Sequence, residues 1–468
     1  LKNEFKDYLN EGKDYYKKND LEKSIDSYTK AIDIDPQSTR AYCLRAVAKV
    51  VLKDFIGTLE DCSKAIEINP DYEDAYFLRG YIKIRRLKDI DDGIEDLSKA
   101  IVINPSNAKN YIERGTTKLY EGDDFKGAIE DFTKVIEIKP HYEDAYFDRG
   151  LAKRHLNDFK GSIEDYSKAI EINPKFELAY EYRGLSKNRL FNFKGAIEDF
   201  TKAIEINPNH ESAYNDRGVI KYKSDNCEGA IDDYSKAIEI NPKCETIYIN
   251  RGDAKRQLND LDGAIEDYSK AIEINPKKED AYINRAECKY KLKDLKGSIN
   301  DCTKAIEINP NDKSFYFNRA VCKDELEEFK NSIEDYSKAI EINPDSSSYN
   351  NRGLVRYKSD DCKGAIDDYS KAIEINPNHE NAYSNRAVCK YKLKDLKGSI
   401  DDYTKMIEIN PNNEDAYFNR AVCKYESKDL KGSIDDYTKL IEINPKEEDA
   451  YINRGICKDE LKDLKGSI

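Results

Sequence analysis

The sequence predicts an all-α fold, an elongated solenoid of antiparallel helix pairs. Two observations carry this prediction. Of the twelve intervals between the thirteen prolines, nine are 34 residues, two are 35 and one is 33, and apolar residues within each interval follow helical spacing. A fixed period along the whole chain indicates an array of similar repeats, not one compact globule. The repeats end at Pro36, Pro70, Pro105, Pro140, Pro174, Pro208, Pro242, Pro276, Pro310, Pro344, Pro377, Pro411 and Pro445.

Each repeat reads as two helices joined by a polar break, as residues 415–445 illustrate. The first run has small and aromatic residues at helical spacing, and Asp429 in the break suits an N-cap. The second run carries an apolar stripe and ends at Asn444 and Pro445. Helices of about 12 to 14 residues are marginal alone in water, so stacking on neighbouring repeats must stabilise them.

The domain organisation predicted from this pattern is a single continuous array over residues 1–468, with about 13 full repeats and a truncated fourteenth. Composition barely changes along the chain, so no domain boundary is visible. Three irregularities interrupt the period. One extra residue enters the inter-helix turn near residues 87–92 and another near 121–124, and one residue is missing at 345–348.

Composition excludes several classes of function. The net charge of −14 argues against nucleic acid as a partner, because phosphate binding needs a basic face. No stretch approaches 18 consecutive apolar residues, so no membrane span is expected in this segment. The eleven cysteines are odd in number and form no Cys-x-x-Cys pair, which favours a reducing, cytoplasmic location.

The spacing of the residues that recur in each repeat resembles the pattern of the tetratricopeptide repeat family, whose signature runs Trp-x2-Leu-Gly-x2-Tyr, then Ala-x3-Phe, then Pro. The resemblance covers essentially the whole chain. It implies that the helix pairs stack into a right-handed superhelix, in which the first helix of each pair lines a concave groove. Around Pro276 the matching residues are Tyr248, Arg251, Gly252, Lys255, Ala264, Tyr268, Ala271 and Pro276.

One departure from the family pattern is an arginine before the small residue of the first helix, where the family has leucine. An aspartate recurs in the second helix, and only the first repeat lacks both, with Glu11 and Ser27. We expect the two charges to pair within each repeat and to be partly buried; the alternative is that the arginines bind ligand carboxylates or phosphates. The candidate structural pairs are Arg251 with Asp267, Arg285 with Asp301, and Arg319 with Asp335. On the outer face, Glu266 and Lys270 predict an exposed i,i+4 pair.

The predicted groove has its own recurring residue, because seven consecutive repeats carry asparagine immediately before the arginine. On the family's geometry this position faces the groove, where a carboxamide can donate to and accept from an extended peptide backbone. Copying by recent duplication explains the same uniformity without binding, since the later repeats are nearly identical. The candidates are Asn250, Asn284, Asn318, Asn351, Asn385, Asn419 and Asn453, with the apolar or aromatic neighbours Phe317, Phe418, Val321, Leu354, Val388, Val422, Tyr357 and Tyr391.

No catalytic, cofactor or metal site is predicted. The four histidines have no partner at ligand spacing, and no phosphate loop or nucleophile elbow is present. Five of the eleven cysteines, Cys288, Cys322, Cys389, Cys423 and Cys457, take one position of the first helix where other repeats have alanine, which is typical of small core packing. Cys62 and Cys302 take the position that usually holds tyrosine in the second helix, and are interpreted in the same way.

The sequence therefore predicts a non-enzymatic protein-interaction scaffold that binds peptide segments of partner proteins in a groove. Two alternatives remain open. One is a structural spacer or self-assembling array that associates through exposed repeat ends. The other is an accessory interaction arm of a larger enzyme or receptor.

Overall fold

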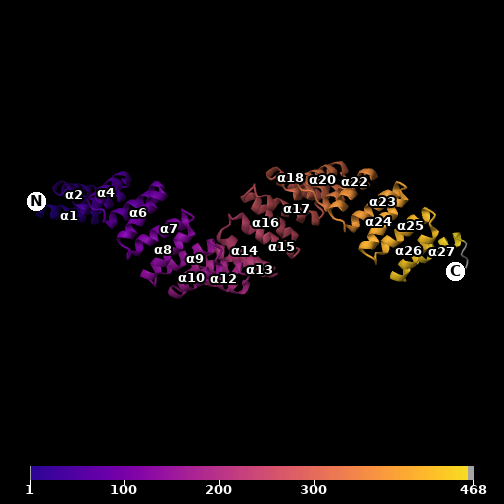
Figure 1. Cartoon of the computed structure of the whole chain (residues 1–468), viewed down its shortest axis with the longest axis horizontal. Coiled ribbons are helices and arrows are strands. Elements are labelled where there is room, and N and C mark those ends of the chain that lie inside the picture. The colour runs from indigo at the N-terminus through magenta and orange to yellow at the C-terminus, as the bar shows by residue number, and fades with distance from the viewer. Residues whose placement is uncertain (1, 462–468) are drawn as a thin grey trace. The chain divides into compact units, whose positions relative to one another are not determined.

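The computed structural model describes residues 2–461, and every regular element in this range is a helix, which confirms the all-α prediction. The helices alternate in antiparallel pairs along the chain (Figure 1). They form two compact units, residues 1–241 and 242–468, whose boundary falls at the end of a repeat. The single continuous array over 1–468 stays a prediction. The second helix of the last repeat would fall within residues 462–468, outside the described range.

The N-terminal unit contains seven helix pairs. Their bounds are α1 (Lys2–Lys17), α2 (Leu21–Ile34), α3 (Thr39–Val51), α4 (Phe55–Ile68), α5 (Glu73–Ile82) with its π-helical extension η1 (Lys83–Leu87), α6 (Ile90–Ile103), α7 (Ala108–Tyr120), α8 (Phe125–Ile138), α9 (Glu143–His155), α10 (Phe159–Ile172), α11 (Glu177–Arg189), α12 (Phe193–Ile206), α13 (Glu211–Lys223) and α14 (Cys227–Ile240).

The described part of the C-terminal unit contains six pairs and one further first helix. Their bounds are α15 (Glu245–Gln257), α16 (Leu261–Ile274), α17 (Glu279–Lys291), α18 (Leu295–Ile308), α19 (Lys313–Glu325), α20 (Phe329–Ile342), α21 (Ser346–Lys358), α22 (Cys362–Ile375), α23 (Glu380–Lys392), α24 (Leu396–Ile409), α25 (Glu414–Glu426), α26 (Leu430–Ile443) and α27 (Glu448–Glu460).

The turn inside most repeats is short, because the residue with a left-handed conformation that closes the first helix is followed directly by the N-cap residue of the second helix. In the α9–α10 pair, Asn157 takes a left-handed conformation with φ of 61°, and the Asp158 N–H donates to the Lys153 carbonyl at 2.9 Å. This is a Schellman closure. The Asp158 side chain then accepts from the Gly161 N–H at 2.9 Å as the N-cap of α10. The antiparallel packing of each pair therefore follows from two adjacent residues.

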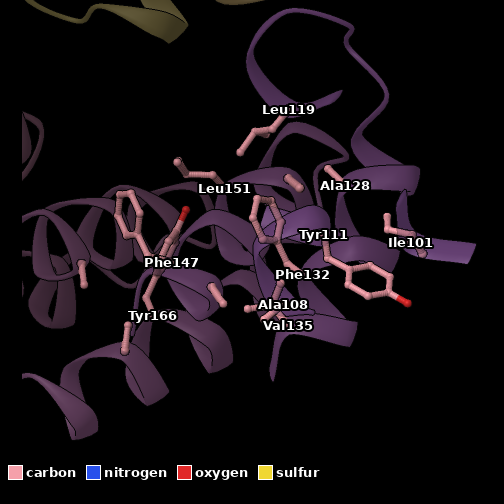
Figure 2. Close-up of a cluster of buried hydrophobic side chains, with 14 residues drawn as sticks. Ile101, Ala108, Tyr111, Leu119, Ala128, Phe132, Val135, Phe147, Leu151 and Tyr166 are labelled. Carbon is pink, nitrogen blue, oxygen red and sulfur yellow. The ribbon is translucent and has the colours of Figure 1, made fainter. Parts of the chain in front are cut away.

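Within each unit, the core lies between the two helices of a pair and between that pair and the next. Figure 2 shows part of it in the N-terminal unit, where Phe132, Phe147 and Tyr166 lie among alanine and leucine side chains. The ring centroids of Phe147 and Tyr166 are 5.7 Å apart. Gly150 faces Tyr166 so closely that a Cβ atom there would lie 2.7 Å from the ring. The small residue of the first helix thus makes room for the aromatic residue of the second.

The three irregularities of the period appear as three different local structures. The first extra residue lies earlier than predicted, because the end of the first helix widens into the π-helical turn η1. The second lies in the turn after α7, at residues 121–124, as predicted. The missing residue shortens the loop between α20 and α21, where Asp345 caps α21 by accepting from the N–H groups of Ser347 and Ser348.

Candidate functional site

Every predicted arginine and aspartate pair lies within one repeat. In Arg285 and Asp301, Nη2 is 2.6 Å from Oδ1 and Nε donates to Oδ2 at 2.9 Å, a bidentate contact. The Asp301 carboxylate is fully buried, whereas the arginine is about one-sixth exposed. Arg251 with Asp267 and Arg319 with Asp335 have the same geometry, at 2.6 and 2.7 Å. Their functional groups are therefore directed at each other.

Two further partners of this pair were not predicted. A lysine one turn after the arginine shares the carboxylate, as Lys289 Nζ does at 2.8 Å from Asp301 Oδ2. The third guanidinium nitrogen, Nη1 of Arg285, donates to the Ser269 hydroxyl of the preceding repeat at 2.9 Å. Both were visible in the sequence as recurring residues, Lys four after the arginine and Ser or Thr two after the aspartate. We call this arrangement of Arg, Asp, Lys and Ser or Thr the ion-pair ladder.

The row of asparagines is half-buried, and several of its members bond to neighbouring first helices. Asn284 Nδ2 donates to Asp253 Oδ1 at 3.1 Å, and Asn385 Nδ2 donates to Asn350 Oδ1 at 3.2 Å. Asn419 donates to its own helix, at the Asp415 carbonyl. Asn250, Asn351 and Asn453 also have polar neighbours. Asn318 differs, because its side chain has no hydrogen-bond partner within residues 2–461.

The apolar candidates divide into core and surface. Phe317 and Phe418 pack edge-on against Tyr336 and Tyr437 of their own repeats, with ring centroids 5.4 and 5.8 Å apart. These two phenylalanines are half-buried and partly structural. Leu354 and Val422 are half-buried and Val388 is exposed; Lys392 lies over the Tyr357 ring, and the Tyr391 hydroxyl donates to Glu426 of the next first helix.

A pocket of about 370 Å³ opens between α17 and α19 on the first-helix side. Two of the predicted residues, Asn318 and Val321, line it. The remaining lining residues come from the same two helices and from Ser298 of α18: Ala286, Glu287, Tyr290, Lys291, Ser298 and Cys322. A second, smaller pocket beside Phe418 has an acidic rim formed by Glu414, Asp415, Glu447 and Asp449. Pocket size and mixed lining suit a side chain of a bound segment.

In the N-terminal unit the position of the asparagines holds other residues, including two half-buried carboxylates. Burial raises the pKa of Asp148 to about 6, although the Tyr120 hydroxyl donates to it at 3.0 Å. Burial likewise raises the pKa of Asp216 to about 6, with a further rise from the charge of Glu181. The chemistry at this position of the first helix therefore differs between the two units.

The raised pKa of Asp148 predicts a pH effect on stability. An aspartate that titrates near 4 when unfolded and near 6 when folded binds more protons in the folded state between these values, so its contribution falls as pH rises through that window. Asp148→Asn is expected to stabilise the protein by about 1 to 2 kcal/mol at pH 7 and by much less at pH 4. Chemical denaturation at both pH values measures this. Glu164→Gln, an exposed carboxylate on α10, is the control, and equal gains at both pH values would contradict the prediction.

The cysteines and histidines form no reactive cluster. Burial raises the thiol pKa of Cys43 and Cys302 to about 12 and that of Cys288 to about 11, so these thiols stay protonated near neutral pH. Within residues 2–461, no group of three or more His, Cys, Asp or Glu side chains is arranged to hold a metal ion. No helix in that range has the length and apolar character needed to cross a membrane.

Comparison with known families gives matches through most of the chain. Patterns described as Tetratricopeptide repeat match residues 143–176, 279–312, 314–346 and 380–413, and also 179–210, 346–379 and 414–447. A pattern described as TPR repeat matches residues 12–50 and 252–293. Together these ranges cover more than half of the sequence. No curated protein matches the chain.

Several solved structures are similar to parts or most of the chain. YrrB, described as a TPR protein with an unusual peptide-binding site, is 21% identical over 43% of this chain and all of its own, with a TM-score of 0.36. MamA is 25% identical over 37% of this chain and 94% of its own, with a TM-score of 0.35. Yeast Tom70 is 18% identical over 91% of this chain and 96% of its own, with a TM-score of 0.35.

Proposed function

Because the chain belongs to the tetratricopeptide repeat family, we propose that it is a non-enzymatic scaffold that binds peptide segments of partner proteins along its first helices. The observation that carries this proposal is the pocket between α17 and α19. It combines an apolar wall at Val321 with the carboxamide of Asn318, which no other described side chain engages. An extended peptide needs both kinds of contact.

The ion-pair ladder takes no part in this binding. Each of its aspartates is buried against the arginine and the following cation of its own repeat, as Asp301 is against Arg285 and Lys289. A guanidinium whose three nitrogens each donate to a partner in the fold, as those of Arg285 do, has little capacity for a ligand carboxylate. We therefore assign the arginine and aspartate departures from the family pattern to structure.

The partners are proteins, and the compartment is reducing, as in the cytoplasm. Eleven free cysteines support this, since ten of them are buried in packing positions and the chain is stabilised without disulfides. The acidic character of the chain, with a net charge of −14, disfavours nucleic acid.

The test compares Asn318→Ala with Asn331→Ala on arrays of random peptides. Asn331 is exposed on α20, away from the pocket, so it is a matched control. Because Asn318→Ala removes one carboxamide contact, it is expected to lower the affinity for bound peptides by about fivefold to tenfold. Thermal melting checks that both variants fold. Peptides that bind both variants equally would contradict this site, and sedimentation showing only self-association would favour the assembling array.

A further inference from the structure

One position of the second helix follows the ladder aspartate directly and faces the small residue of the first helix; we call it the aromatic position. In the thirteen complete repeats it holds eight tyrosines, two phenylalanines, one leucine and two cysteines. The tyrosines are buried, as Tyr336 and Tyr369 show at 2% and 0% exposure. Three repeats therefore lack the ring: one has the fully buried Leu97, and the other two have the smaller side chains of Cys62 and Cys302.

The surroundings of a tyrosine at this position are well defined by Tyr336. Its ring packs in a cluster with Ala320, Val321 and Val355, and the carboxamide of Asn351 lies within hydrogen-bonding reach of its hydroxyl. The charge of Asp324 also acts on that hydroxyl. In the α15–α16 repeat, the Tyr268 hydroxyl donates to Asp253 at 2.7 Å. The ring thus reaches from the core to polar groups on the first-helix side.

The pocket between α17 and α19 is lined by the counterparts of those same residues, one repeat earlier. Ala286, Glu287, Tyr290, Asn318 and Cys322 correspond by the repeat spacing to Ala320, Val321, Asp324, Asn351 and Val355. Cys302 lies beside it, because its thiol is close to both Ser298 and Cys322, two lining residues. The pocket therefore occupies the space that a tyrosine ring fills in other repeats.

A pocket also lies near the other cysteine, and two of its lining residues, Val47 and Leu78, correspond by the repeat spacing to Glu287 and Asn318. Cys62 packs with Cys43 and Leu78, and these two residues line a pocket of about 370 Å³ together with Leu44, Val47 and Phe77. Here Leu78 stands where the other pocket has Asn318. The pocket near Cys62 therefore lacks that carboxamide.

We propose that the pocket beside Cys302 binds a tyrosine side chain of a peptide ligand, whose ring takes the place of the ring that Cys302 lacks. The hydroxyl lies at the Asn318 carboxamide and the Glu287 carboxylate, as the Tyr268 hydroxyl lies at Asp253. Glu287 is held there by Arg256 at 2.6 Å. This inference rests on the proposed function, since it names the residue type that the groove recognises.

The first experiment uses p-cresol, the side-chain analogue of tyrosine, and ligand-detected NMR on the full chain. The Cys62→Tyr background fills the other pocket, and the test variant adds Cys302→Tyr. Tyrosine is the usual residue at both positions, so both variants are expected to fold, and their melting curves check this. We expect p-cresol to bind Cys62→Tyr, toluene to bind it more weakly, and neither to bind the double variant. Equal p-cresol binding by the two proteins would overturn the inference.

The second experiment selects displayed random peptides on the Cys62→Tyr protein and counter-selects on the double variant. Enrichment of tyrosine over phenylalanine supports the inference, and peptides that bind both proteins equally overturn it while leaving the proposed function intact. Binding of p-cresol without any selected peptide would support the pocket and overturn the scaffold function. The two ideas therefore fail in different ways.

Discussion

Replacing Arg285 with alanine is expected to destabilise its repeat by about 3 to 5 kcal/mol, because the substitution leaves a buried carboxylate without its bidentate partner. Asp301 is fully buried, and Lys289 alone then faces it, at 2.8 Å. The Ser269 hydroxyl also loses its donor from the next repeat. The loss of stability therefore has two sources: a buried carboxylate with fewer partners, and a broken hydrogen bond between repeats.

Hydrogen exchange of the α17 and α18 amides, together with the urea midpoint, measures this loss. The control is Lys304→Ala, which removes an exposed pair with Glu307 in the same repeat and is expected to change stability by less than about 0.5 kcal/mol. If the α17 and α18 amides are as well protected from exchange in Arg285→Ala as in the control, the ladder is not the stabilising feature that its burial indicates.

The second large effect is expected at an aromatic position that is filled. Tyr369→Cys should destabilise the α21–α22 repeat by about 2 to 4 kcal/mol, since it removes a fully buried ring and leaves a cavity beside Gly353 and Cys389. It converts a tyrosine repeat into the type that contains Cys302. The urea midpoint and exchange of the α22 amides report the change.

Tyr369→Phe is the matched control for that substitution. The buried Tyr369 hydroxyl has no hydrogen-bond partner among the described residues, so its removal is expected to be neutral or slightly stabilising. Phe132 and Phe200 fill the same position in other repeats. A cost for phenylalanine as large as that for cysteine would assign the effect to the hydroxyl and not to the ring.

Much of the fold was predictable because the same capping residues, helix terminators and apolar spacing recur in each repeat. Asp158 as an N-cap, Asn173 and Pro174 as a terminator, and the period itself predict helix pairs without tertiary information. The pairing of Arg285 with Asp301 followed from two charges that recur together. Long-range contacts within a repeat are thus encoded by position in the period.

Other features were not predictable, because several partners compete for one side chain. Lys270 was expected to pair with Glu266 but lies 2.6 Å from Glu273, one turn the other way. Asn284 was expected to face a ligand, yet it bonds to Asp253. The pocket beside Cys302 depends on the space that a tyrosine ring fills in other repeats and that the smaller cysteine leaves open. The sequence alone indicated only small core packing at this position.

The contact between Arg285 and Ser269 gives the array a direction. Each arginine depends on the repeat before it, whereas the serine or threonine that it contacts already donates to its own helix, as Ser269 does to the Ile265 carbonyl. Losing the following repeat therefore leaves a hydroxyl that is still satisfied, but losing the preceding one leaves a guanidinium N–H unpaired. Unfolding from the C-terminal side of such a stack is therefore the less costly route.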